Sequence, residues 1–212
     1  MDLAQVLLLF IPLLISLTVH EAGHALVAYW GGDRTAYLGG QVSLNPVPHV
    51  KREPFGMVIL PLIAIFMSQG QWTIGFASTP IDPLWAQAHP RRAALMALAG
   101  PVANLLLAAL AFALLKVLMA SGMDLYGPGT GAVEKIALMF LTLNVLLMVF
   151  NLIPIPPLDG ASVLEGLLPR QIGPLLNLVR ATPMFGIIGI VAAWKLMDVL
   201  YPPALDFVLG ML

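Results

Sequence analysis

The chain has 212 residues, of which 59% are hydrophobic and 10% are charged, whereas ordinary soluble domains are about 45–50% apolar and about 25% charged. This balance excludes a typical soluble protein and indicates a membrane protein with several spanning segments. A net charge of −1 offers no basic surface, so nucleic acid is excluded as the main partner. The chain has no cysteine, which excludes disulfide scaffolds, thiolate metal sites and thiol nucleophiles.

Four segments are long and apolar enough to cross a bilayer, whose hydrocarbon core of about 30 Å needs about 20 helical residues. They are the predicted spanning helices 3–30, 92–119, 134–153 and 183–201. The first is not expected to be a signal peptide, because the chain starts Met-Asp without positive charge. We therefore predict an all-α polytopic membrane protein, with residues 1–212 forming a single integral-membrane domain.

A fifth apolar block, 55–70, contains Pro61 and either spans the membrane or only dips into it. The cations between the predicted spans are Arg34, Lys51, Arg52, Arg91, Arg92, Arg170 and Arg180. A full crossing would divide these seven almost evenly between the two sides, whereas a re-entrant block would leave all of them on one side. The positive-inside rule favours the re-entrant block, with the cations in the cytoplasm and the N-terminus outside.

Two further segments between the first and second spans are predicted to be extended. Residues 37–46 mix apolar and polar side chains around a glycine pair and end at a proline, which predicts a short β-hairpin. Residues 73–80 form the second such segment. Backbone of this kind at membrane depth must be buried in protein or line a wet cavity, so both segments are expected to border a functional site.

Two histidines and a glutamate stand inside the first predicted span, as His20, Glu21 and His24 of the sequence HEAGH. Residues four apart lie on one face of a helix, so both imidazoles can bind one metal ion from the same side. Glu21 stands beside them, where a carboxylate can take a proton from metal-bound water. The alternative is a polar network that packs helices together. Ionisable groups at membrane depth are functional by default, which favours the metal site.

A third protein ligand is expected, because catalytic zinc sites usually have three. The best candidate is Asp159, which follows the third predicted span in the proline-rich sequence NLIPIPPLDG at 151–160. Its prolines break the helix, so the chain can turn a carboxylate back toward the bundle. The alternative is a helix cap or a turn residue before Gly160. With a re-entrant block, the first and third spans run in the same direction, which places Asp159 at the depth of the histidines.

Three motifs together resemble the signatures of the site-2 proteases, which are intramembrane zinc metalloproteases. They are HEAGH in the first span, AGPVAN at 99–104 in the second, and NLIPIPPLDG after the third. A HEAGH-type pattern alone is moderate evidence, but its combination with a proline-rich LDG sequence over a hundred residues later is far more specific. Nothing in the chain resembles the PDZ or CBS modules of some family members.

The resemblance implies a role for each matching residue. His20, His24 and Asp159 would bind one Zn²⁺, Glu21 would be the general base, and Asn104 would help to position the substrate. For Asn104, interhelical hydrogen bonding is an equally good interpretation.

The implied function is hydrolysis of peptide bonds in membrane-protein substrates, within or near the bilayer, as in regulated intramembrane proteolysis. The implied partners are a transmembrane protein or peptide and the lipid bilayer, and the active site of this multi-pass cell-membrane protein would face the cytoplasm. Residues 37–46 would receive the unwound substrate by strand addition, and 55–70 would gate access. The rival function is metal binding without hydrolysis, in a transport component or scaffold, which would not require a glutamate beside the first histidine.

Overall fold

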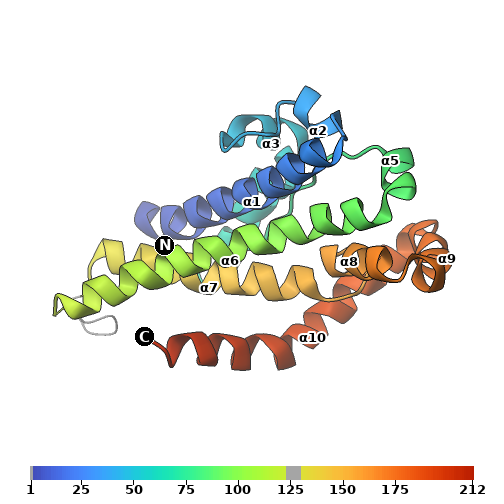
Figure 1. The fold of residues 1–212 in the computed structure, drawn as a ribbon. Coiled ribbons are helices and arrows are strands. Elements are labelled where there is room, and N and C mark those ends of the chain that lie inside the picture. Colours follow the sequence, from blue (N-terminus) through green and yellow to red (C-terminus); the bar gives the residue numbers. More distant parts are fainter. Residues whose placement is uncertain (1, 123–129) are drawn as a thin grey trace.

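The computed structural model describes residues 2–122 and 130–212, and it is a bundle built around long apolar helices (Figure 1). Four of the described helices are long and apolar enough to cross a membrane. They are α1 (Leu3–Gly31), α6 (Pro90–Ala120), α7 (Ala132–Leu152) and α10 (Pro183–Leu209). These helices coincide with the four predicted spans, so the prediction of an all-α polytopic membrane protein is confirmed at this level.

Helix α6 lies between α1 and α7 in the bundle (Figure 1), and small residues let it approach α1 closely. A Cβ added to Gly23 of α1 would stand 2.9 Å from the carbonyl oxygen of Ala99 on α6. Such small-residue contacts are typical of helix packing in membranes, where backbones can approach only if side chains are absent. The tight α1–α6 interface brings polar groups of α6 within bonding distance of the α1 histidines.

The predicted β-hairpin at 37–46 is wrong, because the described residues contain no strand. Two short helices flank a turn instead, α2 (Thr35–Leu38) and α3 (Pro46–Arg52). The Asn45 side chain accepts a hydrogen bond from the amide of Val47, and Pro46 occupies the first helical position. Asparagine followed by proline is therefore a helix start here and not the end of a strand. Without a hairpin, strand addition to residues 37–46 has no basis.

The block 55–70 forms a π-helical turn η1 (Phe55–Ile59) that continues into α4 (Leu60–Met67). Together they cover about 20 Å at 1.5 Å per residue, which is less than the hydrocarbon core of about 30 Å. The chain then returns through an extended segment, 73–80. The Ser78 hydroxyl donates a 2.6 Å hydrogen bond to the carboxylate of Glu53, just before η1. The block and the returning segment together thus begin and end at the same end of the bundle.

Asp33 fixes this return beside the C-terminal end of α1. One carboxylate oxygen accepts hydrogen bonds from the amide and hydroxyl of Thr35, at 2.8 and 2.6 Å. The other accepts a 2.8 Å hydrogen bond from the amide of Asp82. Burial alone would raise the pKa of Asp33, but these hydrogen bonds outweigh it and hold the pKa below its ordinary value near 3.8.

The remaining helices gather at the end of the bundle opposite the two chain termini (Figure 1). They are α5 (Pro83–Ala88), α8 (Asp159–Leu167) and α9 (Pro169–Arg180). A tight turn links α7 to α8, and glycines allow its close packing. A Cβ at Gly160 would collide with the carbonyl oxygen of Leu152, and one at Gly189 of α10 with that of Pro156. Helix α10 therefore packs directly on the turn that presents Asp159.

Candidate metal centre

Helices α1 and α6 hold two imidazoles in a defined orientation. His20 and His24 lie one turn apart on α1 and are both buried. The Nδ1 atom of His24 is 2.7 Å from the carbonyl oxygen of Met96, and that of His20 is 2.6 Å from Oδ1 of Asn104. Both partners are acceptors, so each ring carries its proton on Nδ1 and leaves Nε2 with a free lone pair. This is the tautomer that binds a metal through Nε2.

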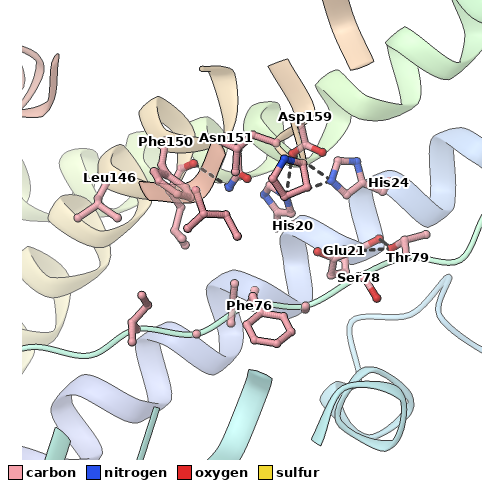
Figure 2. Close-up of a pocket in the computed structure, with 18 of the residues that line it drawn as sticks. His20, Glu21, His24, Phe76, Ser78, Thr79, Leu146, Phe150, Asn151 and Asp159 are labelled. Carbon is pink, nitrogen blue, oxygen red and sulfur yellow. Dashed lines mark hydrogen bonds and ion pairs between the residues drawn. The ribbon is translucent and has the colours of Figure 1, made fainter. Parts of the chain in front are cut away.

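Asp159, the first residue of α8, completes a set of three converging ligand atoms (Figure 2). The two Nε2 atoms are 3.0 Å apart. Oδ2 of Asp159 is 3.2 Å from Nε2 of His20 and 3.4 Å from Nε2 of His24. Ligands around a tetrahedral zinc ion with bonds of about 2.0–2.1 Å are separated by about 3.3 Å. The three atoms thus have the spacing of a zinc site.

Two further observations fit a cation at this position. Oδ2 of Asp159 is buried and has no hydrogen-bond partner among the described residues, which leaves a carboxylate oxygen to be satisfied. Gly100 of α6, midway between Met96 and Asn104, leaves a gap beside the ligand atoms. A Cβ there would stand 2.5 Å from Nε2 of His20 and nearer still to Nε2 of His24. The residues present therefore fit a bound metal ion.

Glu21 lies on the other side of the imidazole pair from Asp159, next to the extended segment (Figure 2). Its buried carboxylate accepts a 2.7 Å hydrogen bond from the hydroxyl of Thr79, which is also 3.0 Å from the Glu21 carbonyl oxygen. A Glu21 carboxylate oxygen also lies within 4.8 Å of the imidazole ligand atoms, so distance alone allows it as a ligand. Its hydrogen bond to Thr79, however, suits a carboxylate that stands beside the metal as a base.

A cavity of about 560 Å³ adjoins these residues. Most of its wall is apolar and comes from α1, α7, α10 and the segment 73–80. Representative wall residues are Leu13, Leu17, Phe76, Leu146, Phe150 and Trp194. Asn151, at the end of α7, also lines the cavity, and its side-chain NH donates a 3.0 Å hydrogen bond to the carbonyl of Leu147. Figure 2 labels Asn151, together with His20 and His24, among the residues that line this cavity.

Asn104, for which the family resemblance implies a role in positioning the substrate, lies inside the helix bundle. Its side chain is fully buried and is not among the residues that line the cavity. The amide oxygen lies against His20, and the amide nitrogen donates a 2.8 Å hydrogen bond to Oδ1 of Asn144. Both ends of the amide are thus engaged inside the bundle, and the role of Asn104 in positioning the substrate stays a prediction.

No role in the site could be assigned from the sequence to Thr79, Asn144 or Asn151. Segment 73–80 was expected to border the site, but nothing in it distinguishes the hydroxyl at position 79 from that at 78. Asn151 belongs to a motif that was recognised, and its place at the end of a span, eight residues before Asp159, is the signal that could have indicated it. Asn144 lies mid-helix without any such signal.

Sequence comparisons relate the chain to known proteins, and the matching family profile includes the first two motifs, HEAGH and AGPVAN. The sequence profile of peptidase family M50 matches residues 8–136. A Bacillus subtilis protein named "Putative zinc metalloprotease YwhC" is 37% identical over 162 residues, which cover 76% of this chain and 69% of that protein.

Proteins named "Putative zinc metalloprotease Rip2" are 33% identical over 155 residues in Mycolicibacterium smegmatis and 35% identical over 153 residues in Mycobacterium tuberculosis. Each alignment covers 72% of this chain but only 54% of the relative, so the chain spans about half the length of these proteins. No solved structure matches the chain.

Proposed function

Because this chain belongs to peptidase family M50, the site-2 protease family of zinc metalloproteases, we propose that it cleaves membrane-protein substrates within or beside the bilayer. One observation carries the proposal: three metal-ligand atoms converge at 3.0–3.4 Å beside a buried glutamate, at the wall of an apolar cavity between membrane-spanning helices. His20, His24 and Asp159 would hold the zinc, and Glu21 would be the general base.

The remaining roles follow from the chemistry of peptide hydrolysis. A bound zinc would acidify a water and polarise the scissile carbonyl. Glu21 would take one proton from the attacking water as the water oxygen bonds to the carbonyl carbon, and would give a proton to the departing amine as the C–N bond breaks. Thr79 keeps the Glu21 carboxylate in place during both transfers. Asn151 lines the cavity and is our candidate for donating a hydrogen bond to the developing oxyanion, in place of Asn104.

The cavity supports an apolar substrate segment that is locally unwound. Leucine and aromatic side chains line its walls, and the extended segment 73–80 forms one side. A helix hides its carbonyl groups in its own hydrogen bonds, so a transmembrane substrate must open before Glu21 and the metal can act on it. We propose that the cavity receives such an opened segment of a single-span protein.

The membrane orientation is part of the same proposal. The block 55–70 is too short to cross the membrane. Through the hydrogen bond between Ser78 and Glu53, the chain after the block returns to the end of the bundle where the block begins, which supports a re-entrant segment. The seven cations between the spans then lie on one side, so this side, nearest the metal centre, is proposed to be cytoplasmic. Since the chain has no cysteine, single cysteines at His89 and Ser121 would test this. We expect a membrane-impermeant thiol reagent to label them from opposite sides.

The function itself is tested with purified wild type and Glu21→Gln reconstituted in vesicles with a panel of labelled single-span substrates. Bound zinc is measured in both proteins. We expect equal zinc content, with cleavage by wild type and a loss of at least about a hundredfold in the variant. Equal cleavage by both proteins would refute the role of Glu21. Zinc uptake into the vesicles without cleavage of any substrate would instead favour the rival function, a metal-transport component.

A further inference from the structure

A network of hydrogen bonds starts at His20 and joins three membrane-spanning helices. From His20 on α1 it passes to Asn104 on α6, at 2.6 Å. From Asn104 it passes to Asn144 on α7, at 2.8 Å, and Asn144 then donates a 2.9 Å hydrogen bond to the hydroxyl oxygen of Ser16. Ser16 is on α1 again, one turn before His20. The network therefore begins and ends on α1.

Each side-chain amide in this network, that of Asn104 and that of Asn144, has one orientation that pairs every donor with an acceptor. His20 donates from Nδ1 if its Nε2 binds metal, so Asn104 must present its oxygen to the His20 imidazole and its NH₂ group to Asn144. Asn144 must then present its oxygen to Asn104. Its own NH₂ group donates to Ser16 and, at 2.8 Å, to the carbonyl oxygen of Phe140. A flip of either amide would face a donor with a donor.

Burial fixes these amide orientations. Ser16, Asn104 and Asn144 each have 0% of their surface exposed, so water cannot replace a lost partner. A buried polar group without a partner is costly, and fully satisfied buried networks hold their members rigidly. The orientation of Asn144 is thus transmitted through Asn104 to the ring plane and tautomer of His20.

We propose that Asn144 is a positioning residue of the zinc site, which acts on His20 through Asn104 although it touches neither the metal nor the cavity. The proposal rests on the assignment of His20 as a zinc ligand. Groups that hydrogen-bond directly to metal-binding histidines typically change metal affinity by about 10–100-fold when they are lost. Asn144 acts one hydrogen bond further away, so we expect a loss of about tenfold, at the lower end of that range.

The competing explanation is that Asn144 merely joins α7 to its neighbours, as polar residues in membrane helices often do. The two explanations differ in their readouts. A residue that only joins helices changes the stability of the bundle, whereas a positioning residue changes the zinc dissociation constant of the folded protein. They also differ for Asn144→Asp. A buried aspartate at this position would be neutral and would keep one oxygen acceptor for Asn104 and one OH donor for Ser16 or Phe140.

The test measures zinc affinity by chelator competition in detergent, on proteins shown to be helical and monodisperse. Asn144→Leu removes the acceptor and keeps the number of heavy side-chain atoms, and Asn144→Ala removes it without added bulk if the leucine variant does not fold. Asn144→Asp is the rescue variant. Thr142→Val is the matched control, because it removes a hydroxyl on the same helix that, among the described residues, donates only to carbonyls of its own helix, at 3.0 Å to Leu138 and 3.3 Å to Met139. His24→Ala tests the ligand assignment itself.

We expect about tenfold weaker zinc binding in Asn144→Leu or Asn144→Ala, and affinity near wild type in Asn144→Asp and Thr142→Val. Wild-type affinity in a folded variant that lacks the acceptor would overturn the proposal. So would an aspartate variant that loses as much affinity as the leucine variant. Wild-type zinc binding by His24→Ala would instead refute the ligand assignment on which both proposals depend, so the two failures are distinguishable.

Discussion

Replacing Gly100 with alanine adds one methyl group at the most sensitive point of the metal centre. The new Cβ would stand 2.5 Å from Nε2 of His20, and it would be nearer still to Nε2 of His24. Ordinary van der Waals contact begins near 3.4 Å, so at least one ligand atom must move by about 0.9 Å. Metal–ligand distances in proteins keep within about 0.2 Å of their usual values. The variant therefore cannot keep both imidazoles on the zinc.

The expected loss of zinc affinity is at least about a hundredfold, which corresponds to about 2.7 kcal/mol. The same substitution favours the helix, because alanine in a helix interior is about 0.5–1 kcal/mol more stable than glycine. Gly100→Ala should therefore leave a folded bundle with a damaged metal centre. Zinc content after dialysis and chelator competition measure the first effect, and thermal unfolding of the metal-free protein measures the second.

Gly186→Ala is the matched control, since it makes the same change inside another spanning helix, α10. An added Cβ there meets no atom within 4 Å, so zinc affinity should stay at the wild-type value. The reasoning is refuted if Gly100→Ala binds zinc as tightly as Gly186→Ala does.

Three further predictions concern the ligand, the base and the end of α1. Asp159→Ala should abolish stoichiometric zinc binding in a protein that remains helical, and retained zinc would remove Asp159 from the ligand set. Thr79→Val should lower cleavage by roughly tenfold or more, since it removes a hydrogen bond to the charged Glu21, while Thr79→Ser and the zinc content stay near wild type. Asp33 has a folded-state pKa below its unfolded value, so its stabilising contribution is present at neutral pH and is lost as pH falls through the folded pKa. Asp33→Asn should thus lower the unfolding temperature at pH 7 but not in strong acid, and an equal difference at both would contradict this.

The convergence of His20, His24 and Asp159 could be predicted because each of its signals is local. The spacing of His20 and His24 fixes both imidazoles on one helix face whatever surrounds them. Asp159 could be predicted because proline-rich sequence after a span must break the helix, and positive-charge counting indicated that the first and third spans run in parallel. The apolar lengths of the four spans follow directly from bilayer thickness.

The parts that could not be predicted depend on contacts between distant residues. Thr79 reaches Glu21 across 58 positions, and Asn104 reaches His20 across 84. A single asparagine inside an apolar helix predicts some hydrogen bond but not its partner. The failed hairpin has a local cause, because Asn45 followed by Pro46 suits both a turn after a strand and a helix N-terminus. Only the hydrogen bond from Val47 distinguishes the two.

X-ray absorption at the zinc edge tests the central claim most directly. In the zinc-loaded Glu21→Gln protein, which should bind metal without cleaving substrate, we expect four ligands at about 2.0–2.1 Å, two of them with the scattering of imidazole rings. Asp159→Ala should lose the bound metal, and His20→Ala should lose one imidazole. An unchanged spectrum in His20→Ala, or a zinc shell without imidazole, would contradict the account.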